Sequence, residues 1–368
     1  MLQNKKILII SPEDFGVVFL SKHHYAEELS KKNKVWFLNA KGNRRQKKLI
    51  EISNEDSNLN IVSYFNLFFG FGKIPFWLTK LINNFLSTRI RRAMGDVDIV
   101  WTFEQSKFFD LDLFGAKHKI FHPVDYIDQF HFEKKLISDS ADIIFSVTDE
   151  ILNTLVTSTP KHFINHGVQI SNSCQQANLS IDRQKVNIGY VGNINSPYLD
   201  IKNLLKAVEL NNDAMFHFIG PYESSNLGQI KSSNNYESLK RCKNVVFHGV
   251  ISKPILVNTL KKFDILISCY NNSKDPIRLS NSHKILEYFG TGKIIVSNYF
   301  PVYKSIDREI ICLVEDNSMF GERVQEVSGK LEFYNEIEKQ KVRLVLAKEN
   351  SYSNQIKRIE ELLDNQLK

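Results

Sequence analysis

Residues 280–297, SNSHKILEYFGTGKIIVS, indicate more about the architecture of this chain than any other stretch. They predict a helix that begins after a polar cap at Ser282, ends at a glycine and leads into the buried strand Ile294–Ser297. Lys284 and Glu287 are three residues apart and therefore lie on one helix face. The free amides of such a helix start and its positive dipole end favour an anion. An ammonium group beside phosphates and a carboxylate that accepts ribose hydroxyls complete a predicted nucleoside-diphosphate site.

An ordinary surface helix would have a similar sequence, because helices often begin at Ser or Asn and a Lys and a Glu on one face are usually solvated. Four short apolar runs upstream favour the binding site. Three of them close on a glycine, where a ligand can approach the backbone. The four runs are Ile188–Ile194, Met215–Pro221, Asn244–Val250 and Phe263–Cys269.

The order of these motifs resembles the C-terminal half of the GT-B glycosyltransferases. The pattern is strand-Gly-Asn, strand-Ile-Gly-Pro, Asn-Val-x-Phe-x-Gly, Asp-Ile-x-Ile and Lys-Ile-x-Glu-Tyr-x-x-x-Gly-Lys-x-x-Val. More narrowly, it is similar to bacterial enzymes that build capsule, exopolysaccharide or O-antigen chains, and it covers residues 185–300 well. The resemblance implies an α/β protein of two Rossmann-like domains with doubly wound parallel sheets facing a central cleft. It also implies a C-terminal helix that crosses back to the N-terminal domain.

The resemblance assigns roles to particular residues. In the family the helix start and its Lys grip the diphosphate, the Glu binds the ribose, and the glycine after the Asn-Val-x-Phe strand lies near the base. Many retaining members have a second Glu eight positions before the ribose Glu, where this chain has Leu279. A subgroup resembling the xanthan glucuronosyltransferase lacks it and inverts the sugar with a carboxylate base of the N-terminal domain. The implied nucleotide-sugar-binding residues are Gly192, Asn193, Gly249, Val250, Ser282, His283, Lys284 and Glu287.

Length and composition indicate a globular protein. The chain has 368 residues, a length sufficient for two domains with separate cores. Of these residues 42% are hydrophobic and 24% are charged, a composition typical of globular proteins. A formal charge of +7 suits an acidic ligand or an anionic surface. The four cysteines lie far apart without metal-type spacing and indicate a reducing cytosol. No apolar stretch suits a secretory signal or a spanning helix, so we expect a cytoplasmic protein, soluble or peripheral to the inner face of the plasma membrane.

Strands alternate with helix-length segments in both halves, which predicts doubly wound parallel sheets. The polar segment Ser171–Asp182 is typical of a linker. We expect an acceptor-binding domain at 1–175, a nucleotide-sugar-binding domain at 176–345 and a C-terminal helix at 346–368. The elements predicted in the first domain are strands Lys6–Ile10, Lys34–Leu38, Val97–Trp101, Lys119–Phe121 and Ala141–Ser146, and a helix at Ser21–Lys31 whose His23 and His24 are expected on a surface lining the cleft.

The residues after the strand that ends at Phe121 include a candidate catalytic base. Sugar transfer with inversion needs a base for the acceptor hydroxyl proton, and open α/β sheets bind ligands at the carboxyl ends of their strands. Asp125 or Asp128 could supply this base. Glu13 or Asp14 in the first strand-to-helix loop is a second candidate. In the alternative interpretation Asp125 only caps a helix.

Residues 64–92 combine many aromatic and aliphatic side chains with the basic end Arg89, Arg91 and Arg92. This pattern is typical of a helix that lies in an anionic membrane surface, and such a surface would bring a lipid-linked acceptor to the enzyme. A helix packed in a protein core has nearly the same pattern, and Pro75 divides the segment into a loop and one helix. Both interpretations stay open at this point.

No motif indicates a metal. Asp96–Asp98 and Asp110–Asp112 match the Asp-x-Asp metal motif of the other glycosyltransferase fold, but the first precedes a strand instead of ending one. A strand separates His118 from His122, and no further ligand joins them. Gly70–Gly72 lacks the remaining glycine of a dinucleotide loop. We expect no metal and no cofactor besides the donor substrate, with the helix dipole and the neighbouring ammonium group stabilising the departing diphosphate.

The sequence therefore predicts a metal-independent glycosyltransferase. It would move a sugar from a nucleoside-diphosphate sugar, a UDP-sugar in our interpretation, to a hydroxyl of a lipid-linked or growing bacterial surface polysaccharide. The expected partners are this donor, the lipid-linked glycan and the inner-leaflet membrane surface through residues 64–92, and no nucleic acid. Two alternatives remain: an isomerase resembling UDP-N-acetylglucosamine 2-epimerase, which shares the fold, and a non-catalytic nucleotide-sugar-binding peripheral membrane protein.

Overall fold

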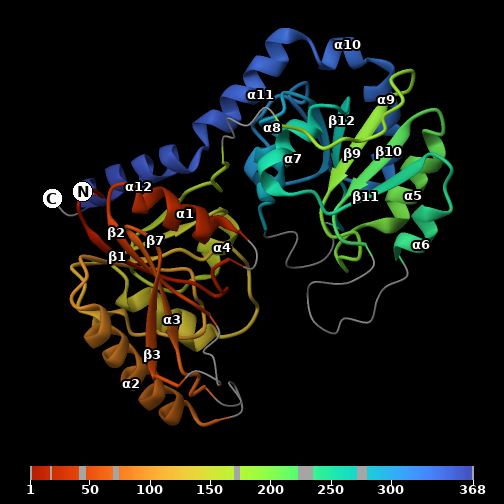
Figure 1. Ribbon diagram of the computed structural model, residues 1–368. Helices are drawn as coiled ribbons and strands as arrows, with labels where there is room; N and C mark the ends of the chain where they lie inside the picture. Colours follow the sequence, from red (N-terminus) through yellow and green to blue (C-terminus); the bar gives the residue numbers. More distant parts are fainter. Residues whose placement is uncertain are drawn as a thin grey trace. The chain divides into compact units, whose positions relative to one another are not determined.

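The chain forms two compact units (Figure 1). Unit 1 comprises Met1–Gly167 and Tyr352–Lys368, and unit 2 comprises Val168–Ser351. The computed structural model describes residues 2–16, 19–40, 47–68, 74–169, 175–222, 235–271 and 280–366.

Unit 1 is built on an eight-stranded sheet. Its strands are parallel except for β3, which pairs antiparallel with β4 and departs from the predicted arrangement. This edge strand, Ile50–Asp56, is exposed over most of its length, so it lacks the apolar run that identifies the central strands. In sheet order the strands are β3 (Ile50–Asp56), β4 (Leu59–Tyr64), β2 (Lys34–Leu38), β1 (Lys6–Ile10), β5 (Ile99–Thr102), β6 (His118–Phe121), β7 (Ile143–Ser146) and β8 (Lys161–Phe163).

Helices cover both faces of this sheet, because alternate residues of the central strands point to opposite sides and are apolar on both. Ile7 and Ile9 of β1 belong to the core under helices α1 (Ser21–Ser30) and α12 (Tyr352–Gln366). Leu8 belongs to the opposite core, under α2 (Phe76–Met94), α3 (His131–Ser140) and α4 (Asp149–Thr154). Tyr352, Ile359 and Leu363 of α12 are buried, so the C-terminal helix is part of the core of unit 1.

Unit 2 contains a six-stranded sheet in which every pairing is parallel. Helices again cover both faces. In sheet order the strands are β11 (Val245–Gly249), β10 (Met215–Ile219), β9 (Asn187–Val191), β12 (Ile265–Ser268), β13 (Ile294–Asn298) and β14 (Ile311–Val314). The helices are α5 (Ile201–Leu210), α6 (Asn235–Lys240), α7 (Lys253–Leu260), α8 (His283–Phe289), α9 (Phe320–Gly329), α10 (Leu331–Tyr334) and α11 (Ile337–Glu349).

Each sheet reverses its strand order at one point. In unit 1 the chain proceeds from β1 to β2 on one side and later returns to add β5 on the other. In unit 2 it proceeds from β9 to β10 and returns to add β12. Ligands of doubly wound proteins bind at the carboxyl ends of the strands beside such a reversal. The predicted fold class of two doubly wound α/β domains is confirmed, and it defines one place in each unit where a site is expected.

Helix α2 has two different faces. It begins directly after Pro75, as predicted, and buries one face that includes Leu86 and Ile90. The other face exposes Trp77, Leu81 and Phe85 to 64%, 58% and 43%. The core interpretation therefore holds for the buried face, and membrane contact by the exposed face stays a prediction. Within the described part of the chain, no helix combines the length and the hydropathy needed to cross a bilayer.

Candidate active site

Three strands of unit 2 end in closely packed glycines. Gly192 follows β9, Gly220 follows β10 and Gly249 ends β11. The amide of Gly192 donates to the carbonyl of Ile219 at 2.9 Å, and that of Gly220 to the carbonyl of Gly249 at 2.8 Å. Gly192 and Gly220 have φ of 148° and 137°, and a Cβ on Gly220 would overlap the Gly192 carbonyl. Only glycine fits this conformation and spacing, so bare backbone faces the site.

Lys284 lies above this backbone. Its Nζ is 5.0 Å from the ring centre of Tyr190 and 4.7 Å from that of Tyr270, distances typical of cation–π contacts. It also donates a hydrogen bond to the Tyr270 hydroxyl. A Cβ on Gly192 would overlap Nζ. The cation therefore lies over the Gly192 backbone, at the reversal point between β9 and β12.

The aromatic residues around Lys284 were not identified from the sequence. Burial by itself raises the pKa of Tyr270, but the Lys284 ammonium stabilises the phenolate and brings this pKa below its ordinary value. The Tyr288 hydroxyl accepts from the Val191 amide at 2.9 Å and donates to the Ile267 carbonyl at 3.2 Å. Tyr288 thus joins α8 to β9 and β12 and holds the helix start in place.

Helix α8 confirms the predicted helix and glycine stop. It begins at His283 after Ser282, whose extended backbone caps it, and ends at Phe289 before Gly290. The Ser282 carbonyl accepts from the amide of Ile285 at 3.1 Å. Lys284, His283 and Glu287 are half-buried on this helix. Gly192 and the helix start are therefore brought together, as the resemblance implied, while Leu279 lies outside the described residues.

Two predicted residues at this edge occupy turns. The Asn193 side chain accepts from the amide of Asn195 at 3.0 Å and so shapes the loop after β9. Val250 follows Gly249 and is 75% exposed. Gly249 itself ends the edge strand β11. These positions line up along the carboxyl edge of β9, β10 and β11, the edge on which the predicted donor site lies.

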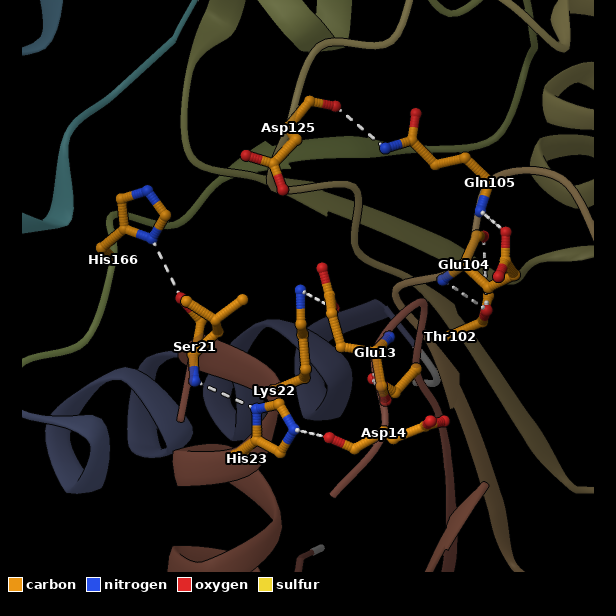
Figure 2. Close-up of polar contacts among 12 residues, drawn as sticks. Glu13, Asp14, Ser21, Lys22, His23, Thr102, Glu104, Gln105, Asp125 and His166 are labelled. Atoms are coloured by element: carbon orange, nitrogen blue, oxygen red, sulfur yellow. Dashed lines mark hydrogen bonds and ion pairs between the residues drawn. The ribbon is translucent and has the colours of Figure 1, made fainter. Parts of the chain in front are cut away.

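Unit 1 presents carboxylates at the corresponding edge (Figure 2). Glu13 follows β1, Glu104 follows β5 and Asp125 follows β6. Glu13 forms an ion pair with Lys22 of α1, whose side chain is 1% exposed. Burial raises the pKa of Glu13, the repulsion from Asp125 and Glu104 adds to this effect, and Lys22 opposes it. A half-buried carboxylate with a raised pKa is a suitable general base.

Local hydrogen bonds hold this acidic group in place. Ser11 accepts from the amide of Glu13 at 3.0 Å and donates to its carbonyl at 2.7 Å. Glu104 accepts from the amide and the hydroxyl of Ser106 at 2.8 and 2.6 Å. The Gln105 side chain donates to the Asp125 carbonyl at 2.9 Å. These Glu104 bonds all involve Oε1, and Oε2 of Glu13 pairs with Lys22, so a local contact holds one oxygen of each carboxylate.

Lys22 and Glu104 were missed by the sequence analysis. Lys22 stands next to two histidines in a helix that reads as polar, and no local pattern marks it as buried. Glu104 follows β5, a strand that was predicted, and this position after a strand was the one signal that could have identified Glu104 as a site residue. Asp128 is not joined to this group, since its 76% exposed carboxylate accepts from the Tyr126 hydroxyl and lies 3.6 Å from His131.

The prediction that His23 and His24 lie on a helix surface is wrong. Both are buried, because α1 packs between the sheet and α12. His23 Nδ1 accepts from the Leu20 amide at 3.0 Å, and its Nε2 is 3.1 Å from the Asp14 carbonyl. Burial lowers the pKa of His23 to about 4, so the ring is neutral and positions the loop that carries Glu13.

His122, which follows β6, is also structural. It is 1% exposed and accepts from the indole of Trp101 at 3.3 Å. Burial, reinforced by nearby His166, lowers its pKa to about 3. His166 in turn lies 3.2 Å from the hydroxyl of Ser21 (Figure 2). At neutral pH the His122 ring is therefore uncharged.

The acidic motifs considered for metal binding have other partners. Asp96 pairs with Arg91 at 3.0 Å, and Asp112 with Lys119 at 2.6 Å. Across the residues that the structure describes, no three His, Cys, Asp or Glu side chains are grouped so as to hold a metal ion. The segment Gly70–Gly72 lies outside the described residues.

Solved structures share this architecture over almost the whole chain. No protein-family model and no curated protein matches the sequence. Sucrose-phosphate synthase from Thermosynechococcus elongatus matches with a TM-score of 0.73 and 10% identity over 99% of both chains. A UDP-forming α,α-trehalose-phosphate synthase from Burkholderia xenovorans matches with 0.71 and 12% over 100% of both. HepE from Anabaena in complex with UDP-glucose matches with 0.71 and 11% over 98% of this chain and 100% of its own.

These neighbours identify the fold. The chain has the GT-B fold, as the motif order implied. Identities of this size establish the fold alone, and one fold can support many activities. The activity therefore has to be argued from the residues at the two strand reversals.

Proposed function

We propose that this protein is a glycosyltransferase that uses a UDP-sugar as donor. The observation that supports it most is the position of Lys284, whose ammonium group lies over the bare backbone of Gly192 at the reversal point of unit 2. A diphosphate needs a cation and free space next to backbone amides. Two fold neighbours also support a UDP-sugar donor, since one is described as UDP-forming and another was solved with UDP-glucose.

In this proposal the donor makes three groups of contacts. Lys284 and the first-turn amides of α8 bind the diphosphate, the half-buried Glu287 accepts hydrogen bonds from the ribose, and Gly249 with Val250 lies beside the base. The departing UDP carries away the electron pair of the broken bond between the anomeric carbon and the phosphate oxygen. Lys284 stabilises the charge that develops there, a preorganised electrostatic effect.

Glu13 acts as the general base in this proposal. The acceptor hydroxyl oxygen forms the new bond to the anomeric carbon, and its proton passes to the Glu13 carboxylate, so the configuration is inverted. Glu13 is preferred to Asp125 because burial raises its pKa towards the working range of a base. Asp125, which is exposed beside it, orients the hydroxyl.

We further propose that the acceptor is a lipid-linked glycan and that α2 docks on an anionic membrane surface. Trp77, Leu81 and Phe85 are spaced four residues apart and form one exposed apolar stripe. Exposed Lys80 and Arg92 lie on the same helix, which contains no Asp or Glu. A basic helix with an exposed aromatic stripe suits the headgroup region of an anionic bilayer.

Turnover with candidate acceptors tests the central proposal. Purified protein is incubated with UDP-sugars, with and without a polyprenyl-diphosphate-linked sugar, and UDP release and lipid-linked product are measured. We expect UDP release that depends on acceptor and a product of inverted anomeric configuration. Epimerised free UDP-sugar formed without acceptor would instead support the isomerase alternative, and tight UDP binding without any turnover would support a non-catalytic protein.

Vesicle sedimentation tests the membrane proposal. The wild type should bind vesicles that contain phosphatidylglycerol more strongly than vesicles of phosphatidylcholine alone. Replacing Trp77, Leu81 and Phe85 together by Ser should abolish this binding. The matched control is Val156→Ser, which removes an apolar side chain of unit 1 that is 77% exposed and outside α2. Equal binding by the triple variant and the wild type would refute docking through α2.

A further inference from the structure

A cavity of unit 2 lies at the edge of its sheet opposite to Gly192 and Lys284. Its volume is about 630 Å³, a size typical of small-molecule sites. Asn187 begins β9, Asp264 directly precedes β12 and Lys293 directly precedes β13, and all three line the cavity. The cavity therefore lies at the amino ends of these strands, whereas Gly192 and Lys284 lie at the carboxyl side.

The lining is strongly basic. It contains Arg183, Lys261, Lys262 and Lys293 against the single carboxylate of Asp264. Within the part of the chain that the structure describes, none of the four cations has an ion-pair partner. Other basic residues of unit 2 do have one, such as Lys339, which lies 3.1 Å from Glu309.

The polar groups of Asp264 form hydrogen bonds that join the amino ends of β9 and β12. Its carboxylate is therefore not directed at the four cations. Its carboxylate accepts from the Asn187 amide at 2.8 Å, and its own amide donates to the Asn187 carbonyl at 2.7 Å. Its carbonyl accepts from the Asn335 side chain at 3.0 Å. The acidic group is thus part of the wall, and the ligand-facing charge of the cavity is positive.

The wall is also rigid. Asn187 is 2% exposed, and its side-chain amide donates to the carbonyls of Asp182 and Lys185 at 2.9 and 2.7 Å. Its side-chain carbonyl accepts from His217 at 2.9 Å. Lys262 donates to the Ala177 carbonyl at 2.7 Å, which connects Ala177 to the residues just before β12. A preformed wall of this kind reduces the ordering cost of binding.

We propose that this cavity binds a phosphorylated small molecule at a site separate from that of the donor diphosphate. Uncompensated ammonium and guanidinium groups around an open cavity of this size suit a multiply charged phosphate ester, and Arg183 can form paired hydrogen bonds to one phosphate. The inference goes beyond the proposed transfer reaction and does not require it, since it rests on the opposite edge of the sheet.

Calorimetric titration with inorganic tripolyphosphate tests this site. The titration uses full-length protein with Lys284→Ala, so that the predicted donor site competes little. We expect one tripolyphosphate to bind, and at least tenfold weaker binding when Arg183→Gln and Lys293→Gln are added. The matched control is Lys304→Gln, a charge removal at an exposed position of the same unit outside the cavity, which should leave the affinity within twofold.

Two results would overturn the proposal: no binding by the Lys284→Ala protein, or equal affinity with and without the two cavity substitutions. Both replaced side chains lie at the surface of the cavity rather than in a core, and circular dichroism would verify that the variants are folded. Binding of UDP is measured in the same variants with Lys284 restored. Unchanged UDP affinity there supports a separate site, and a parallel loss of UDP binding contradicts it.

Discussion

The two units share the strand reversal of a doubly wound sheet and differ in the chemistry at the carboxyl edge beside it. In unit 1 the strands beside the reversal are followed by carboxylates, Glu13, Glu104 and Asp125, with one buried ammonium from Lys22. In unit 2, glycines follow β9 and β10, and the cation of Lys284 lies over Gly192. The topology places a site, and the residues that follow each strand determine what the site can bind.

The difference predicts a division of work. Clustered carboxylates repel phosphates and suit a hydroxyl that has to lose a proton. Backbone amides and an ammonium group attract phosphates. Substitutions in unit 1 should therefore change turnover and leave nucleotide affinity intact, whereas substitutions in unit 2 should weaken nucleotide binding. The following predictions test this division in order of expected size.

Glu13→Gln should lower kcat about 10²- to 10⁴-fold, because a general base contributes roughly this factor. UDP affinity should stay within twofold. UDP release measures the first quantity and calorimetry the second. Since Lys22 loses its ion-pair partner in this variant, Glu13→Gln combined with Lys22→Met serves as a folding control. Asp128→Asn removes an exposed carboxylate of the same unit and should have little effect. Full turnover in Glu13→Gln would exclude Glu13 as the base.

Lys284→Ala should raise the Kd for UDP about 10- to 100-fold, since a hydrogen bond to a charged group contributes about 1.5–3 kcal/mol. Calorimetry with UDP measures the change. Lys304→Ala, an exposed position of the same unit, provides the matched control and should bind UDP like the wild type. Unaltered UDP affinity in Lys284→Ala would remove the main support for the donor site.

Lys22→Met should shift the acidic limb of the kcat/KM profile to higher pH. Burial raises the pKa of Glu13 and Lys22 opposes this effect, so loss of the ammonium raises the pKa further. The methionine keeps the length of the buried stem. A pH–rate profile measured for both proteins shows the shift. A limb that stays in place or moves to lower pH would mean that Glu13 does not control it.

Each unit also buries a neutral histidine, and this similarity predicts acid sensitivity. Burial lowers the pKa of His122 in unit 1 to about 3 and that of His217 in unit 2 to about 4. An unfolded histidine titrates near 6.5. The free energy of unfolding should therefore be highest above pH 6.5 and fall as the pH drops towards 4, by at most about 1.4 kcal/mol per pH unit for each histidine.

Replacing His217 by Gln should reduce this slope. Urea unfolding curves at pH 7, 6 and 5 give the free energy for the wild type and the variant. His217 contacts His248 at 2.9 Å, so His248→Gln should change the slope as well, by a smaller amount. A slope that is the same in wild type and His217→Gln would mean that this histidine does not titrate on unfolding.

Part of the fold was predictable from local patterns. The strand Lys34–Leu38 was predicted with its observed limits, and the helix start at Ser282 was placed correctly, because apolar runs and caps are local signals. Strand β3 was missed, since an exposed edge strand exists through its pairing with β4. His24 was misplaced, because its burial depends on Tyr352, whose ring centre lies 4.9 Å away and which is remote in sequence.

Part of the candidate site was likewise predictable from the sequence, and part of it was not. Gly192 and Lys284 belong to motifs whose order along the chain already indicated a nucleotide site. The ion pair between Lys22 and Glu13 had no signal in the sequence, and neither did the basic cavity of unit 2.

Local sequence was sufficient for most of the buried strands, the glycine ends and the basic helix start, because backbone conformation and burial on both sheet faces depend on residues close in the chain. Folding was needed to determine which carboxylates meet Lys22 and which cations of unit 2 stay unpaired. These properties depend on distances between segments that are far apart in sequence, and on burial, which sets the cost of each charge.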